Sequence, residues 1–169
     1  MPQKKGYHIL LFDFLYAPYH RVYQRLHVKK DGFQTYFNVQ HLLIKLSSQE
    51  RGFLDYLIEQ ADMQNRVYVD VDFKDQYCTF LRQKLHLKTV PAFNNLDKIL
   101  KKLGDLGLIF REQGKQAFFR INPKYFWKGS EVSRKDAIYE LIVNRASSNL
   151  PIVHLIDVPE DEFLRNMNR

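Results

Sequence analysis

The chain has 169 residues, of which 45% are hydrophobic and 14% aromatic, a composition that supports a sizeable core and excludes wholesale disorder. No apolar run approaches the roughly 20 residues that a membrane-spanning helix needs, and the single cysteine, Cys78, excludes an internal disulfide and a cysteine-rich zinc site. The formal net charge of +7 favours polyanionic partners, of which nucleic acid is the first candidate.

Residues 1–46 are predicted to form an N-terminal extension that contains a β-hairpin. Lysines followed by an apolar stretch imitate a secretory signal, but Asp13 interrupts the stretch and no small-x-small cleavage motif follows. We therefore expect a cytoplasmic protein without membrane contact. Apolar residues alternate on both sides of "KKDG", and an Asp-Gly pair is typical of a hairpin turn, so the hairpin is predicted at residues 21–39.

Three helices are predicted next, with a short strand between the first two. Ser47 and Glu50 fit a capping box at the start of the helix "SSQERGFLDYLIEQAD". "NRVYVDVD" indicates a strand, and Asp72 is predicted to cap the second helix, "FKDQYCTFLRQKL". Thr89 with Pro91 is predicted to begin the third helix.

The predicted third helix, residues 90–104, has one apolar and one polar face. Its apolar residues recur at helical spacing, and Gly104 or Gly107 can terminate it. Asparagine can pair bidentately with adenine, and lysine suits phosphates or guanine edges, although an ordinary solvated helix face is the alternative. The residues predicted to contact DNA here are Asn94, Asn95, Lys98, Lys101 and Lys102.

A tight β-hairpin is predicted after this helix, with "LIFRE" and "QAFFRI" as strands around "QGK" and Gly114 at the turn. Its basic residues can contact phosphate, although a lysine at a hairpin tip often serves solubility alone. In the following "NPKYFWKG", Tyr125, Phe126 and Trp127 could stack on unpaired bases, but core packing is the expectation for Phe126 and Trp127. The further residues predicted to contact DNA are Arg111, Lys115, Arg120, Lys124 and Lys128.

A last helix is predicted at residues 134–145, with Ser133 as its cap. The order of helix, strand, two helices, hairpin and helix predicts an α+β fold: a winged helix-turn-helix with an N-terminal β-hairpin extension and a C-terminal helix. We accordingly divide the chain into the extension (1–46), a winged-helix DNA-binding domain (47–129), and a C-terminal helix and tail (130–169).

Basic residues concentrate in two segments of the chain. Residues 88–128 hold nine Lys or Arg against three Asp or Glu, and residues 1–46 hold seven against two. The first of these segments contains the third predicted helix and the hairpin. A patch of this kind attracts DNA, with solvated lysines that serve solubility as the alternative.

Enzyme chemistry is not expected. No two of the six histidines flank a single hydrophobic residue, as a rolling-circle nickase requires, and neither a Walker loop nor a Gly-x-Gly-x-x-Gly pattern occurs. Asp70, Asp72 and Asp75 could bind a cation, but helix capping is the better explanation for Asp72. We therefore predict no catalytic residue, no metal site and no cofactor.

A hinge that contains Leu106, Gly107 and Ile109 is followed, after the predicted hairpin, by Ile121, Asn122, Pro123, Lys128 and Gly129. Through these residues the chain resembles, over roughly residues 32 to 142, the RepL family of bacterial plasmid replication proteins. "GFQTYFNVQHLLIKLSSQERGFLDYLIEQ" is similar in layout, while the aromatic N-terminus, "TVPAFNN" and the "VPEDEF" tail depart from the family. The resemblance implies a winged-helix protein that binds a plasmid or phage origin and recruits host replication proteins without cutting DNA.

These observations predict a sequence-specific protein that binds double-stranded DNA and initiates or controls replication of a plasmid or other mobile element. A transcriptional regulator of the same fold, and a winged-helix module that docks onto another protein, remain alternatives. One winged helix covers only a short site, so a homodimer is an option, through the N-terminal hairpin or through the helix at 134–145.

Overall fold

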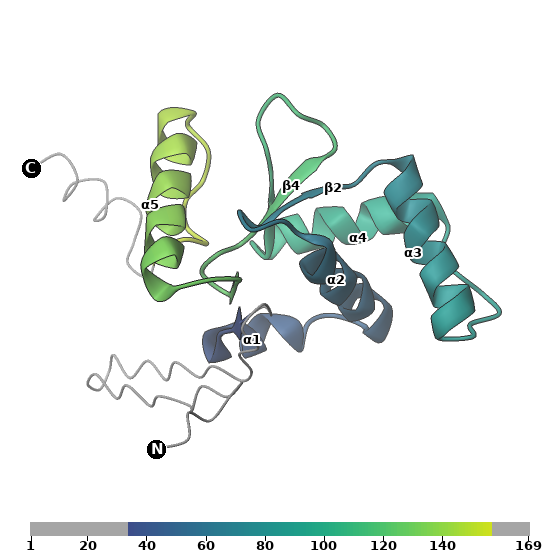
Figure 1. The fold of residues 1–169 in the computed structure, drawn as a ribbon. Helices are drawn as coiled ribbons and strands as arrows, with labels where there is room; N and C mark the ends of the chain where they lie inside the picture. Colours follow the sequence, from purple (N-terminus) through teal and green to yellow (C-terminus); the bar gives the residue numbers. More distant parts are fainter. Residues whose placement is uncertain (1–33, 157–169) are drawn as a thin grey trace, which may run out of the picture. The chain divides into compact units, whose positions relative to one another are not determined.

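The described part of the chain contains helices and short strands (Figure 1). The computed structural model describes residues 34–156; the first strand of the predicted hairpin and the "VPEDEF" tail lie outside this range. The elements in chain order are β1 (Gln34–Thr35), a 3-10 turn (Phe37–Val39), α1 (Gln40–Leu43), α2 (Ser48–Gln60), β2 (Arg66–Tyr68), α3 (Val71–Lys84), α4 (Phe93–Asp105), β3 (Ile109–Arg111), β4 (Phe118–Ile121), β5 (Phe126–Trp127) and α5 (Glu131–Ser147). The fold is mixed α+β, as predicted.

Polar side chains cap α2 and α3. The Ser47 Oγ accepts a hydrogen bond from the Glu50 backbone N–H, and the Glu50 carboxylate accepts one from the Ser47 N–H at 2.7 Å, which confirms the capping box. Asp70 caps α3 by accepting from the Phe73 N–H at 2.8 Å, so the prediction that Asp72 is the cap is wrong. The reason is that the backbone after β2 stays extended as far as Asp70, which places Asp72 already inside the first helical turn.

The third predicted helix, α4, begins later than its sequence pattern suggested. Ala92 is its N-cap residue and offers no side-chain hydrogen bond. The prediction that Thr89 and Pro91 begin this helix is therefore wrong. Pro91 instead lies buried just ahead of the helix.

Three strands form an antiparallel sheet in the order β2-β4-β3. The paired residues are Arg66 with Arg120, Val67 with Phe119, Tyr68 with Phe118, Ile109 with Ile121, Phe110 with Arg120, and Arg111 with Phe119. The loop between β3 and β4 spans residues 112–117, so the predicted tight hairpin around "QGK" is wrong in length. Gly114 does turn the chain in this loop, with a φ of 74° that favours glycine.

The described part of the predicted N-terminal hairpin forms a different pairing. β1 pairs with β5, with Thr35 opposite Phe126, and the Tyr36 N–H donates to the Tyr125 carbonyl at 2.9 Å. The chain then turns into the 3-10 segment, so this strand is shorter than predicted. The N-terminal segment is thereby joined to the aromatic stretch that follows β4.

The core of this part of the chain lies between one face of the sheet and helices α2, α3 and α4. The apolar stripe predicted for α2 is confirmed, because all five of its residues are buried: Phe53, Leu54, Leu57, Ile58 and Ala61. Tyr77 of α3 contributes its ring, 4.8 Å from that of Phe53. Burial of each large side chain of this kind stabilises the fold by roughly 1.5–3 kcal/mol.

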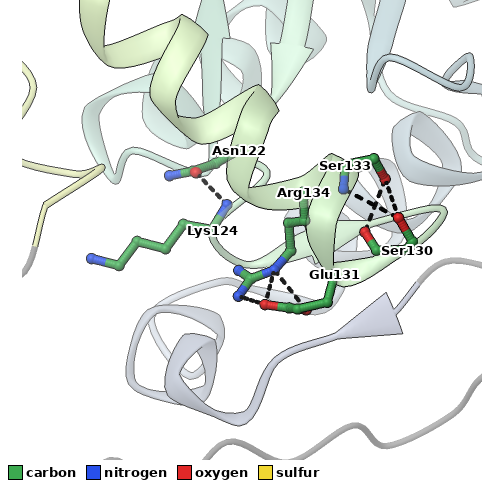
Figure 2. A network of polar contacts seen from close by, with 6 residues as sticks. All are labelled: Asn122, Lys124, Ser130, Glu131, Ser133 and Arg134. Atoms are coloured by element: carbon green, nitrogen blue, oxygen red, sulfur yellow. Dashed lines mark hydrogen bonds and ion pairs between the residues drawn. The ribbon is translucent and has the colours of Figure 1, made fainter.

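Buried Asn122 joins the end of β4 to the hinge that follows α4. Its Nδ2 donates to the Gly107 carbonyl at 2.7 Å, and its Oδ1 accepts from the Lys124 backbone N–H at 2.9 Å (Figure 2). Gly107 has a φ of 69°, which glycine adopts without strain, so it ends α4, whereas Gly104 lies within the helix. The hinge and the Asn-Pro pair are therefore parts of one structural feature.

The chain divides into two units, Met1–Lys128 and Gly129–Arg169, of which the second contains α5. Ser130 caps α5, since its Oγ accepts from the Ser133 N–H at 3.1 Å (Figure 2), and the prediction that Ser133 is the cap is wrong. Ser130 has the extended backbone of an N-cap residue, whereas Ser133 lies in the first turn. Within residues 34–156, no helix combines the length and the apolar character needed to cross a bilayer.

Substitution of Asn122 should destabilise the protein strongly. Asn122→Ala leaves the buried Gly107 carbonyl without this donor, and we expect the free energy of unfolding to fall by about 2–3 kcal/mol. Asn94→Ala, which removes an exposed asparagine from α4, should change it by less than about 0.5 kcal/mol. Urea unfolding followed by circular dichroism measures both values, and equal effects of the two substitutions would contradict the role of Asn122.

Candidate nucleic-acid interface

Helix α4 presents a polar face to solvent and an apolar face to the core. Leu96, Ile99, Leu100 and Leu103 are buried, whereas Asn94, Asn95, Lys98 and Lys101 are exposed and Lys102 is half-buried. The predicted division of this helix into two faces is confirmed. That the polar face contacts DNA stays a prediction.

Two ion pairs hold α4 against its neighbours. The Lys74 Nζ on α3 lies 2.6 Å from the Asp97 carboxylate, and the Lys102 Nζ lies 2.6 Å from the Glu50 carboxylate on α2. The Lys74 and Glu50 side chains are largely buried, so these pairs are less screened by solvent than a surface pair. They fix the position of α4 relative to α2 and α3, against both of which it packs.

The positive charges of α4 are consequently not equivalent. The hydrogen bond from Lys102 lowers the pKa of the Glu50 carboxyl, and that carboxylate balances the lysine charge. Lys101 pairs with Asp105 at 2.9 Å, but both side chains are mostly exposed, so this pair is weak and easily exchanged for another anion. Among residues 34–156 Lys98 has no ion-pair partner, and it is the cation of α4 best placed to meet a phosphate.

The end of β3 and the loop that follows it carry two exposed cations on opposite faces of the sheet. The Arg111 guanidinium lies 5.3 Å from the centre of the Phe119 ring, and the Lys115 Nζ lies 5.1 Å from that of the Phe118 ring. Adjacent residues of a strand point to opposite faces, so Arg111 lies on the helix side of the sheet and Lys115 on the other side. In Figure 1 this loop projects away from α2, α3 and α4.

The remaining cations predicted from sequence are less accessible. Arg120 is only 8% exposed, and its Nε donates to the Gln64 carbonyl at 3.3 Å. Lys124 is half-buried with its Nζ 5.6 Å from the centre of the Tyr125 ring, and Lys128 is half-buried as well. The burial of Arg120 places it inside the fold, and we leave it out of the interface proposed below.

The exposed aromatic residues are not those that the sequence suggested. Phe126 and Trp127 are buried, as expected for core residues, and Tyr125 is buried with them. Tyr68 is instead 50% exposed, and its ring lies 4.7 Å from that of Phe118. Sequence reasoning missed this pair, although the alternation of β2 between buried valines and an exposed tyrosine is a detectable signal.

The acidic residues considered as a cation site have structural roles or lie apart. Asp70 caps α3, and no group of three His, Cys, Asp or Glu side chains within residues 34–156 could hold a metal ion. Cys78 is buried with its Sγ 3.6 Å from the Pro91 carbonyl. Burial raises the pKa of this thiol, which reduces its reactivity.

Comparison with models of protein families, with curated proteins and with solved structures finds no match for this chain. The resemblance to the RepL family, which rests on residues around Gly107 and Asn122, therefore stays a prediction.

The Glu50–Lys102 pair should make stability depend on pH in the acid range. The pKa of Glu50 is lowered in the folded state, so its contribution is fully present above its ordinary pKa of 4.5 and is lost as the pH falls below that value. Glu50→Gln should therefore reduce the loss of unfolding free energy between about pH 5 and about pH 3, a range that spans this pKa. Lys102→Ala should likewise make the free energy of unfolding depend less on pH. Urea titrations across this pH range measure the dependence, and a loss of stability as steep as that of the wild type in both variants would contradict the prediction.

Proposed function

We propose that this protein binds double-stranded DNA through α4, with the loop between β3 and β4 as a second contact. The observation that carries the proposal is the exposed face of α4, where Asn94, Asn95, Lys98 and Lys101 point away from a buried apolar stripe. Asparagine reads adenine in the major groove, and lysine contacts phosphate or guanine. An exposed helix is the element that the major groove admits.

The order of the elements supports a winged helix-turn-helix. Helix α2, strand β2, helices α3 and α4, and strands β3 and β4 follow one another, and the sheet order is β2-β4-β3. In such a domain the last of the three helices enters the major groove and the hairpin that follows lies along the DNA backbone. Arg111, on the helix side of this sheet, is the wing residue best placed for a phosphate near α4.

The proposed role is replication initiation or control on a plasmid or other mobile element, on the basis of the RepL resemblance. The side-chain hydrogen bond from Asn122 to Gly107 gives a structural reason for the shared hinge and Asn-Pro residues. These shared residues support a winged-helix fold, and they do not identify the DNA sequence that is bound. A transcriptional regulator would use the same surface of α4, and a homodimer or a host replication protein would supply the second contact that a short site requires.

A lysine that contacts phosphate should contribute to the salt dependence of binding. We expect affinity for duplex DNA to fall by orders of magnitude between about 50 and 200 mM salt, and Lys98→Ala to reduce the slope of log K against log [salt] by about one. Lys102→Ala is the matched control, because its charge is already balanced by Glu50 and the slope should change little. Fluorescence anisotropy measures both slopes, and binding that is insensitive to salt would favour a protein partner instead.

Asn95 should contribute to sequence recognition more than to affinity in general. A preferred site is first selected from a random pool, and the Asn95→Ala variant should then lose about 1–3 kcal/mol on that site and little on random duplex. Arg111→Ala should weaken both kinds of binding by similar factors, because a phosphate contact carries no sequence information. Equal losses by Asn95→Ala on both DNAs would show that α4 does not read bases through this residue.

A further inference from the structure

The three-stranded sheet has two faces of different character. The inner face packs in the core through Val67, Ile109, Phe119 and Ile121. The register places Arg66, Tyr68, Phe110, Phe118 and Arg120 on the opposite face, which we call the outer face. Phe110 and Arg120 are buried, whereas Tyr68 is 50% exposed and Phe118 is half-buried, so the outer face is open to solvent at this ring pair.

Tyr68 and Phe118 form a rigid aromatic surface. They are directly opposite in the β2–β4 ladder, with ring centres 4.7 Å apart and planes inclined by 46°. The hydrogen bond from the Val69 N–H to the Ala117 carbonyl, at 2.8 Å, extends the ladder beyond them. Scattered exposed aromatics are ordinary, but two rings held in contact by paired strands offer a preorganised surface for a third flat ring.

Two cations accompany this ring pair. The Lys115 Nζ lies over the Phe118 ring, 5.1 Å from its centre, and Arg66 lies on the same side of β2 as Tyr68 with a side chain 41% exposed. Asp62 pairs with Arg66 at 3.2 Å, and Glu112 is the acidic residue of the neighbouring loop. Lys115 is exposed at the tip of that loop and is the positive charge nearest to the rings.

We propose that Tyr68 and Phe118 bind an unpaired base of single-stranded nucleic acid by stacking, with Lys115 contacting the phosphate beside that base. An exposed aromatic pair with a cation beside it matches the alternation of base and phosphate along a single strand. Base stacking on exposed aromatics of a β-sheet is a general way of holding unpaired nucleotides. Such stacking is tolerant of sequence, because every base has a π-face.

This site is separate from the surface proposed for duplex DNA. The stacking pair lies on the outer face of the sheet, whereas the duplex contacts are on α4 and at Arg111 on the helix side. The inference therefore does not rest on the proposed function, and either one can fail while the other holds.

The test uses the full chain and a fluorescein-labelled strand of about ten thymidines at low salt, a length within the usual site size for single-strand binding. Tyr68→Leu should weaken binding by about tenfold or more, because it removes a stacking ring and keeps an apolar side chain. Tyr68→Phe should bind like the wild type. Tyr139→Leu, which replaces an exposed tyrosine on α5, is the matched control and should also bind like the wild type. Thermal unfolding checks that each variant is folded.

Two further strands identify the source of the binding. An abasic strand of the same length keeps the phosphates but has no bases, so the wild type and Tyr68→Leu should bind it equally weakly. A uridine strand shows whether DNA or RNA is preferred. The loss of affinity caused by Tyr68→Leu should appear on both the thymidine and the uridine strand. Equal affinity of the wild type and Tyr68→Leu for the thymidine strand, an equal loss on Tyr139→Leu, or no wild-type binding would each overturn the proposal. Failure of the duplex proposal would appear instead in the α4 variants and leave the effect of Tyr68→Leu intact.

Discussion

Two buried asparagine side chains connect segments that lie far apart in the sequence, and the position of α4 relative to the sheet depends on them. Asn65, at the start of β2, donates to the Phe126 carbonyl at 2.6 Å, and Asn122 donates to the Gly107 carbonyl at 2.7 Å. A buried carbonyl without a partner is costly, so each asparagine stabilises the fold by donating to a backbone carbonyl of a distant segment. Their combined effect is to hold β2, the end of β4 and the turn after α4 in one arrangement. The exposed face of α4 and the loop that follows β3 are positioned by this arrangement.

Ion pairs then decide which charges of the basic segment are available to a ligand. Lys74 and Lys102 are each directed to a carboxylate on a neighbouring helix, and their role is to fix α4. Lys98 and Lys101, on the same helix, remain exposed and are balanced weakly or not at all within the described residues. The net charge therefore overestimates the number of cations available to a ligand, because some of the lysines form ion pairs within the fold. The proposed contact with DNA rests on a smaller set of cations than a count of lysines would suggest.

Local patterns in the sequence predicted where most helices and strands lie. Contacts between residues far apart in the sequence determine which side chains act as caps, form pairs or are exposed, and local patterns do not predict these contacts. Apolar side chains at helical spacing identified α2, α3 and α4, since a helix must bury one stripe wherever it packs. The cap residues of α3 and α5 were predicted wrongly: the caps are Asp70 and Ser130, not Asp72 and Ser133. An N-cap residue must have an extended backbone, and its position therefore depends on where the preceding segment ends. For the candidate site, the solvent face of α4 followed from the same spacing.

Other features of the site had no local signal. Glu50 and Lys102 are 52 positions apart, so their pairing, which removes Lys102 from the set of available cations, is visible only in three dimensions. The burial of Arg120 and the exposure of Tyr68 likewise depend on which strand lies beside β4 and on what covers the sheet. β-strand periodicity assigns residues to one of two faces, but it does not say which face is open.

The two faces of the sheet bear on the choice between a replication protein and a transcriptional regulator. A regulator needs to recognise duplex DNA alone, and the contacts proposed on α4 and at Arg111 would suffice for that. A protein that acts at an origin encounters unpaired strands once the duplex opens, and a second surface that stacks on bases would favour the opened state by binding it selectively. In this protein, Arg111 at the end of β3 and Lys115 in the loop that follows lie over rings on opposite faces of β4. The β3–β4 hairpin would then contribute to both the duplex surface and the single-strand surface. Binding of unpaired bases at Tyr68 and Phe118 would therefore distinguish a replication protein from a transcriptional regulator.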